Sequence, residues 1–184
     1  MNKIARVIVL AVACCPVLAA QVTPTGNEKN GTCSVVRNGV RIPCPETWNI
    51  VDEHHDPYKD EITVGNFPRT PENHNRVSGP GMATIAISGL PKGYEGLERW
   101  IWVGRKNVPD AIETKIELSN QTVGKVSVVC MTSPANSGPA FASYFFQIGK
   151  VPLLLELSYR AQDPKKDEYR AAVQRMIERA SAAR

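Results

Sequence analysis

Several motifs that identify common enzyme classes are missing from this sequence of 184 residues. It contains no G-x-S-x-G turn, and its most glycine-rich turn, residues 79–81, has a proline where a phosphate-binding loop presents backbone N–H groups. Only three histidines are present, all in the first half of the chain, so imidazoles for acid–base chemistry are few. We therefore expect a protein that binds a partner and is not an enzyme.

Long apolar runs and one-sided charge are scarce as well. Apart from a short run near the N-terminus, no segment is apolar enough to predict a membrane span. The 22 basic and 18 acidic residues are interspersed, and no basic stripe alternates with aromatic residues. This pattern argues against nucleic-acid binding, and no motif indicates a cofactor.

The N-terminus has the layout of a secretory signal peptide. Lys3 and Arg6 precede an apolar run at residues 7–13, and small residues follow at 17–19. We predict a signal peptide at 1–20, a flexible polar lead-in at 21–32 and a single domain at 33–184. The protein is then periplasmic or secreted.

A second interpretation of this leader places a lipid anchor at Cys14. The sequence at residues 11–14 loosely resembles a bacterial lipoprotein box, although Ala11 stands where such boxes usually carry leucine. The apolar run before Cys14 is also short for that type of leader. The alternative is therefore a lipid-anchored envelope protein.

Two cysteines flank the strongest hairpin signal in the chain. Asn38-Gly39 favours a two-residue turn, which pairs Val35 with Ile42 and places Cys33 opposite Cys44. Facing positions lie about 4.5–5.5 Å apart, so we predict a disulfide between these two cysteines. Cys130 lies in an apolar run, where a buried, unreactive thiol is expected.

The remaining pattern predicts an α+β fold. Residues 61–64, 82–88, 112–118, 125–131, 143–148 and 151–159 are typical of strands, and hairpin connections favour an antiparallel sheet. Leu97, Trp100 and Ile101 predict a short central helix. Asp163 and Pro164 are typical of a helix start. After them an apolar stripe follows at helical spacing: Tyr169, Ala172, Val173, Met176, Ile177 and Ala180.

Three histidines are weak candidates for a metal site. His54 and His55 lie in the acidic stretch 52–60, and His74 follows in a proline-rich segment. Imidazoles and carboxylates are zinc ligands, but adjacent histidines rarely point the same way and no H-x-x-x-H spacing occurs. We interpret residues 52–60 as an exposed charged turn.

Two aromatic residues are weak candidates for contacts with a partner. Trp102 is placed on the short helix so that it faces away from Trp100, and Phe67 lies in the long loop 66–81. Aromatic residues dominate the energetics of many interfaces. The alternatives are that Trp102 packs under a neighbouring loop and that the loop around Phe67 is only a connector.

The order of features resembles the PsbP-like and DcrB-type exported proteins. The residues that carry this resemblance are Ile42, Pro45 and Trp48, the segment 96–100, and the closing strand and helix at 155–159 and 163–181. The resemblance implies an antiparallel sheet sandwiched by helices, within a group of accessory and binding proteins that includes photosystem subunits and chaperones of secreted toxins. It supplies no catalytic residues.

We therefore expect a non-catalytic binding or accessory protein of a bacterial cell envelope. It would present a sheet face or the 66–81 loop to a protein partner, and a toxin delivered to the periplasm is one such partner. The alternative hypothesis is a metal-binding protein or metallohydrolase that uses His54, His55 and His74.

Overall fold

The structure is a computed structural model, and it describes residues 33–55, 60–68, 77, 79–89, 117–132 and 137–183. The predicted signal peptide and lead-in lie outside these residues, as do the predicted short central helix, Trp102 and His74. Within the described ranges, no helix has the length and apolar character needed to cross a membrane.

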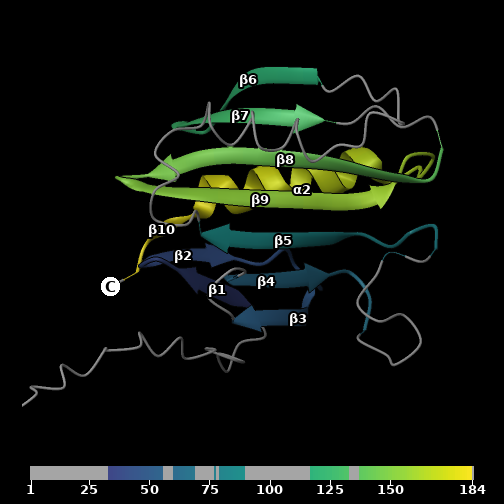
Figure 1. Cartoon of the computed structure of the whole chain (residues 1–184), viewed down its shortest axis with the longest axis horizontal. Helices are drawn as coiled ribbons and strands as arrows, with labels where there is room; N and C mark the ends of the chain where they lie inside the picture. The colour runs from purple at the N-terminus through teal and green to yellow at the C-terminus, as the bar shows by residue number, and fades with distance from the viewer. Residues whose placement is uncertain are drawn as a thin grey trace, which may run out of the picture.

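A seven-stranded antiparallel sheet forms the centre of the molecule (Figure 1). Its strands, in the order in which they lie side by side, are β3 (Asn49–His55), β4 (Asp60–Gly65), β5 (Thr84–Gly89), β9 (Val151–Arg160), β8 (Pro139–Ile148), β7 (Val126–Thr132) and β6 (Glu117–Val123). A turn at Gly149 and Lys150 joins β8 to β9. The expected antiparallel sheet is thus confirmed.

A smaller sheet contains the predicted hairpin. Strands β1 (Ser34–Arg37) and β2 (Val40–Pro43) pair in the predicted register, with Val35 opposite Ile42. Asn38 and Gly39 both adopt positive φ, at 48° and 77°, as a two-residue turn of this type requires. The short strand β10 (Ser181–Ala182), which follows the last helix, pairs with β2 on its other side.

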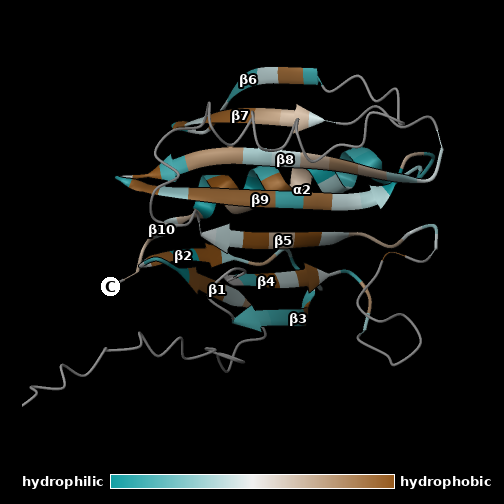
Figure 2. Ribbon diagram, in the orientation of Figure 1, coloured by the Kyte–Doolittle hydropathy of each residue, from teal (hydrophilic) through white to brown (hydrophobic). Residues whose placement is uncertain are grey.

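Helix α2 (Lys166–Arg179) covers one face of the large sheet. The predicted apolar stripe is buried from Tyr169 to Ile177, whereas Ala180 is half-buried after the helix has ended. The helix packs against β9, β6 and β2, and β1 packs against β5, so the small sheet and the helix share one face of the large sheet. Figure 2 shows the brown, apolar positions of β5, β9 and α2 that form this core. The predicted α+β class is confirmed.

Strand β9 is apolar on both of its faces. Leu153 and Leu155 belong to the main core beneath α2. Leu154 points to the opposite face, where it joins Phe145 and Met131 in a second buried cluster. Because β9 lies between β5 and β8, its backbone is also paired on both sides.

One interpretation along the chain needs correction. Residues 52–55 belong to strand β3 and pair with β4, so the interpretation of residues 52–60 as one charged turn was wrong. The strand is at the sheet edge and most of its side chains are exposed, which allows a polar sequence to form a ladder.

Of the strand predicted at 112–118, the structure describes residues 117 and 118, which begin strand β6; residues 112–116 lie outside the described residues. Leu118 is 39% exposed.

Candidate binding cleft

A cleft of about 580 Å³ runs along helix α2. One wall is the connection from β2 to β3, and the other is the polar flank of the helix. Its lining residues are Pro43, Cys44, Pro45, Glu46, Thr47, Trp48, Asn66, Gly81, Lys165, Glu168, Tyr169, Ala172, Arg175, Met176 and Arg179. The volume is in the range of about 300–1,000 Å³ that is usual for ligand sites.

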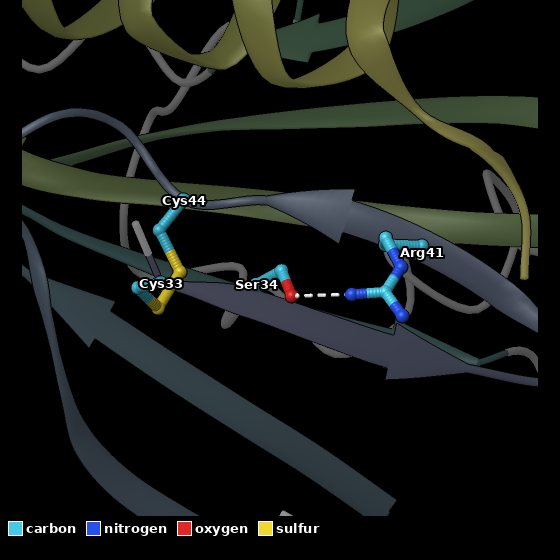
Figure 3. The surroundings of a disulfide bond; sticks show 4 residues. All are labelled: Cys33, Ser34, Arg41 and Cys44. Atoms are coloured by element: carbon cyan, nitrogen blue, oxygen red, sulfur yellow. Dashed lines mark hydrogen bonds between the residues drawn. A yellow bond between two sulfur atoms is a disulfide. The ribbon is translucent and has the colours of Figure 1, made fainter. Parts of the chain in front are cut away.

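The predicted disulfide fixes one end of the connecting wall. Cys33 and Cys44 are bonded, with their Cα atoms 5.2 Å apart, and the Cys44 N–H donates to the Cys33 carbonyl at 2.9 Å. Figure 3 shows this bond beside the hydrogen bond from Arg41 to the Ser34 hydroxyl, which spans the same two strands at 3.1 Å. The wall therefore begins at a covalently closed hairpin end.

Aromatic packing fixes the other end of the wall. The Trp48 ring meets the Tyr169 ring edge to face, with the ring centroids 6.2 Å apart. Strand β10, which follows the C-terminal end of α2, pairs with β2. The wall from Pro43 to Trp48 consequently runs antiparallel to the helix, and buried Trp48, Tyr169, Ala172 and Met176 form the floor.

The base of the 66–81 loop closes the cleft near the N-terminal end of α2. The Asn66 side chain donates to the Gly81 carbonyl and accepts from the Ala83 N–H, both at 2.8 Å. The buried Asp163 carboxylate accepts from Gly81 N–H at 2.6 Å, from Lys165 N–H at 2.9 Å and from the Tyr169 hydroxyl at 3.3 Å. Both ends of the loop are thereby tied to the start of the helix.

The helix start predicted at Asp163 and Pro164 lies two residues too early, because α2 begins at Lys166 and its N-cap residue is Lys165, which has no side-chain capping bond. The Asp163 carboxylate instead accepts from Lys165 N–H in the turn before the helix. Burial, followed by the proximity of this carboxylate, raises the pKa of Tyr169, so its phenol stays protonated and donates.

Five exposed charged side chains line the cleft: Glu46, Lys165, Glu168, Arg175 and Arg179. Within the described part of the chain, no ion pair or side-chain hydrogen bond occupies any of them. Arg170, on the same helix, differs because its guanidinium donates to the Tyr159 hydroxyl at 2.9 Å. The charges of the cleft are therefore available to a ligand.

Thr47, on the connecting wall, has a backbone conformation that β-branched residues rarely adopt. Its φ is +68°, and Asn38, in the hairpin turn, is the one other non-glycine residue with positive φ in the described ranges. A residue in this region costs roughly 1–2 kcal/mol relative to ordinary backbone geometry. Such strain concentrates at binding and catalytic sites, where the surrounding structure maintains it.

The histidines predicted as weak metal ligands do not converge in the described residues. His54 and His55 are neighbours on β3, so their side chains point to opposite faces. His54 Nε2 lies 2.9 Å from Asp52 Oδ2, and His55 Nε2 lies 3.4 Å from Glu53 Oε2, each on its own face. Among the described residues, no group of three potential ligands forms.

Of the two aromatic residues predicted as partner contacts, the structure describes Phe67 alone. Its ring is 7% exposed and lies close to Gly65, so it offers a partner little surface. The position of the loop base matters more, because Asn66 and Gly81 reach the cleft.

Cys130 is a buried free thiol, as predicted. Burial raises the pKa of Cys130 above its ordinary value of 9.0, which favours the protonated and unreactive form. Tyr144 lies beside it, and burial raises the pKa of this phenol as well. Cys130 is not among the residues that line the cleft.

Sequence reasoning missed the cleft itself. It found the apolar stripe of the last helix but had no means of placing the β2–β3 connection beside Arg175 and Arg179 on that helix. The Pro-Cys-Pro segment at 43–45 was the available signal, because two prolines around a disulfide cysteine indicate a stiff connection.

Comparisons with known proteins add only distant likenesses. No family model and no curated protein match this chain. Among solved structures, PA94 of Pseudomonas aeruginosa, a protein of unknown function suggested to be a regulator, has a TM-score of 0.42 at 12% identity and covers 80% of this chain and 94% of its own. LpqN of Mycobacterium tuberculosis, involved in cell envelope biogenesis, has a TM-score of 0.38 at 14% identity. The match covers 83% of this chain and 91% of LpqN.

Likenesses of this size carry no conclusion about function. Neither structure is described as a PsbP-like or DcrB-type protein, so the resemblance inferred from the sequence stays a prediction.

Proposed function

We propose that this chain is a non-catalytic binding protein of an exported compartment, in a bacterial cell envelope, and that it recognises a protein partner through the cleft along α2. The observation that carries the proposal is a preformed cleft lined by five exposed charges that are paired with none of the described residues. A few polar groups around an apolar floor are typical of ligand sites.

Two further observations support the proposed compartment. The leader has the layout of a signal peptide. The Cys33–Cys44 disulfide, which forms one end of the cleft wall, is of a kind that persists outside a reducing cytoplasm. In a reducing cytoplasm the disulfide would be reduced, and the cleft wall would lose its covalent attachment.

The absence of catalysis is supported by the lining of the cleft. The described lining residues include no imidazole and no free thiol, because Cys44 is in the disulfide and the described histidines are on β3. No observation on the described residues favours the metallohydrolase alternative, or a toxin over other proteins as the partner.

Site-specific crosslinking tests the proposal. A photoreactive benzoylphenylalanine is introduced at Glu46 on the cleft wall and, as a matched control, at the exposed Lys150 in the β8–β9 turn. Irradiation of intact cells should give a discrete protein adduct from position 46 and none from position 150. If position 46 gives no adduct, or if both positions give the same adducts, the cleft is not the recognition site.

A further inference from the structure

The two walls of the cleft restrict how a ligand can be held. Pro43 and Pro45 have no N–H group, and the N–H groups of Cys44 and Trp48 donate to Cys33 and Pro45. The opposite wall is a helix, whose interior backbone groups are already bonded to one another. A partner strand therefore finds no continuous backbone edge here, and recognition in this cleft depends on side chains.

The side chains that are available divide along the helix. Lys165 and Glu168, of opposite sign, lie at its N-terminal end, while Arg175 and Arg179 lie together at its C-terminal end. The helix dipole explains a cation in the last turn, at Arg179, but its influence fades before Arg175. Glu46, on the facing wall, forms no ion pair with either guanidinium in the described structure.

The dimensions of the cleft match an extended polypeptide. From Lys165 to Arg179 the helix rises by about 21 Å, which is the length of about six residues of extended chain. Arg175 and Arg179 are four residues apart, a rise of about 6 Å. Alternate residues of an extended chain lie about 6.6 Å apart on one side, so two acidic residues with one residue between them can reach both guanidinium groups.

We infer that the cleft binds an extended acidic peptide segment of the partner, with two carboxylates at alternate positions paired to Arg175 and Arg179. The inference rests on the proposed function and specifies the ligand of the same cleft. Guanidinium groups are suited to such pairing because they bind carboxylates through two parallel hydrogen bonds. The body of the peptide lies over the floor formed by Tyr169, Ala172 and Met176.

Calorimetric titration of the disulfide-bonded protein with defined peptides tests this inference. The probe is a capped serine-rich hexapeptide with aspartates at its second and fourth positions, and two matched peptides carry asparagines or lysines there. The aspartate peptide should bind, and replacing each guanidinium in Arg175→Gln and Arg179→Gln should weaken binding about tenfold. The double variant Arg175→Glu/Arg179→Glu should lose the aspartate peptide and gain affinity for the lysine peptide.

A charge-matched control separates local pairing from net charge. The variant Lys125→Glu/Lys150→Glu makes the same change in net charge at two exposed turns that do not line the cleft. It should keep the affinity of the unmodified protein. Circular dichroism before each titration confirms that every variant is folded, and the glutamine variants cover the case in which the charge-reversed protein does not fold.

Several outcomes overturn the inference. Equal binding of the aspartate and asparagine peptides removes the role of the carboxylates, and full competition by millimolar sodium acetate shows that the site holds only a small anion. If no peptide binds while the Glu46 crosslink still forms, the acidic-peptide inference fails and the proposed function stands. If the crosslink is absent as well, both fail.

Discussion

At the scale of single residues, the shape of the cleft depends on one buried carboxylate and one strained backbone torsion. The Asp163 carboxylate is only 2% exposed, yet it accepts from two backbone N–H groups and a phenol. Thr47, on the wall of the cleft, keeps a left-handed backbone conformation. Both residues have consequences that can be measured as changes in stability.

Replacing Thr47 with glycine should stabilise the fold. Glycine relieves a backbone strain of roughly 1–2 kcal/mol in the folded state. It also raises the conformational entropy of the unfolded chain, which offsets about 0.5–1 kcal/mol of this gain. We expect Thr47→Gly to raise the free energy of unfolding by about 1 kcal/mol in urea titrations. Thr122→Gly, at an exposed position of strand β6 without positive φ, should lower it. Destabilisation by Thr47→Gly would show that the torsion is not strained.

Replacing Asp163 with alanine should destabilise the fold strongly. The change leaves the Gly81 and Lys165 N–H groups and the Tyr169 hydroxyl without their acceptor. We expect a loss of about 2–4 kcal/mol in the free energy of unfolding. Asp167→Ala is the matched control, because its side chain is 80% exposed and 3.9 Å from Arg170, so the loss should stay below about 1 kcal/mol. A similar loss in both variants would contradict this role of Asp163.

At the scale of secondary-structure elements, the connection between β2 and β3 decides the shape of the cleft. The disulfide closes the hairpin at one end of this connection, and the Trp48–Tyr169 contact joins the other end to α2. The element has little regular structure of its own, so these two attachments hold it in place.

Removing the disulfide should therefore lower stability and loosen the cleft. The two cysteines are 11 positions apart, and releasing a loop of this size costs about 2–3 kcal/mol. We expect Cys33→Ser/Cys44→Ser to unfold at correspondingly lower urea concentration and to bind the aspartate peptide more weakly. Dithiothreitol should produce the same shift in the unmodified protein and none in the double variant. An unchanged midpoint would show that the cross-link has no role in stability.

Prediction from sequence worked best for elements with strong local signals. Asn38-Gly39 determines its own turn and so fixes the strand register and the cysteine pair. The apolar stripe of α2 was found because its period matches one helix face. Residues 52–55 of strand β3 were interpreted as part of a turn, because an edge strand with exposed side chains needs no alternating apolar face.

At the scale of the whole molecule, the proposed function joins export to binding. The disulfide at one end of the cleft wall is of a kind that persists in an oxidising compartment, and the predicted signal peptide would supply the route to it. The sequence predicts two alternative forms of the protein, one free and one anchored by lipid.

Intact mass measurement of the protein from an envelope fraction separates these forms. Cleavage after Ala19 or Ala20 should give an unmodified chain that begins at or next to Gln21, with one disulfide and one free thiol at Cys130. A diacylglyceryl group on Cys14 would replace the soluble form with the anchored one. A chain that keeps residues 1–20 would contradict both interpretations of the leader.

The sequence alone determined the α+β class, the hairpin with its disulfide and the amphipathic last helix, because each depends on residues that lie close together in the chain. Only the tertiary structure brought together the cleft at which we propose that recognition takes place. The cleft joins residues 43–48 to residues 165–179, more than a hundred positions later, and their proximity follows from the packing of α2 and the small sheet on one face of the large sheet. Local sequence patterns cannot predict such a contact, because the contact depends on the order of the strands in the sheet.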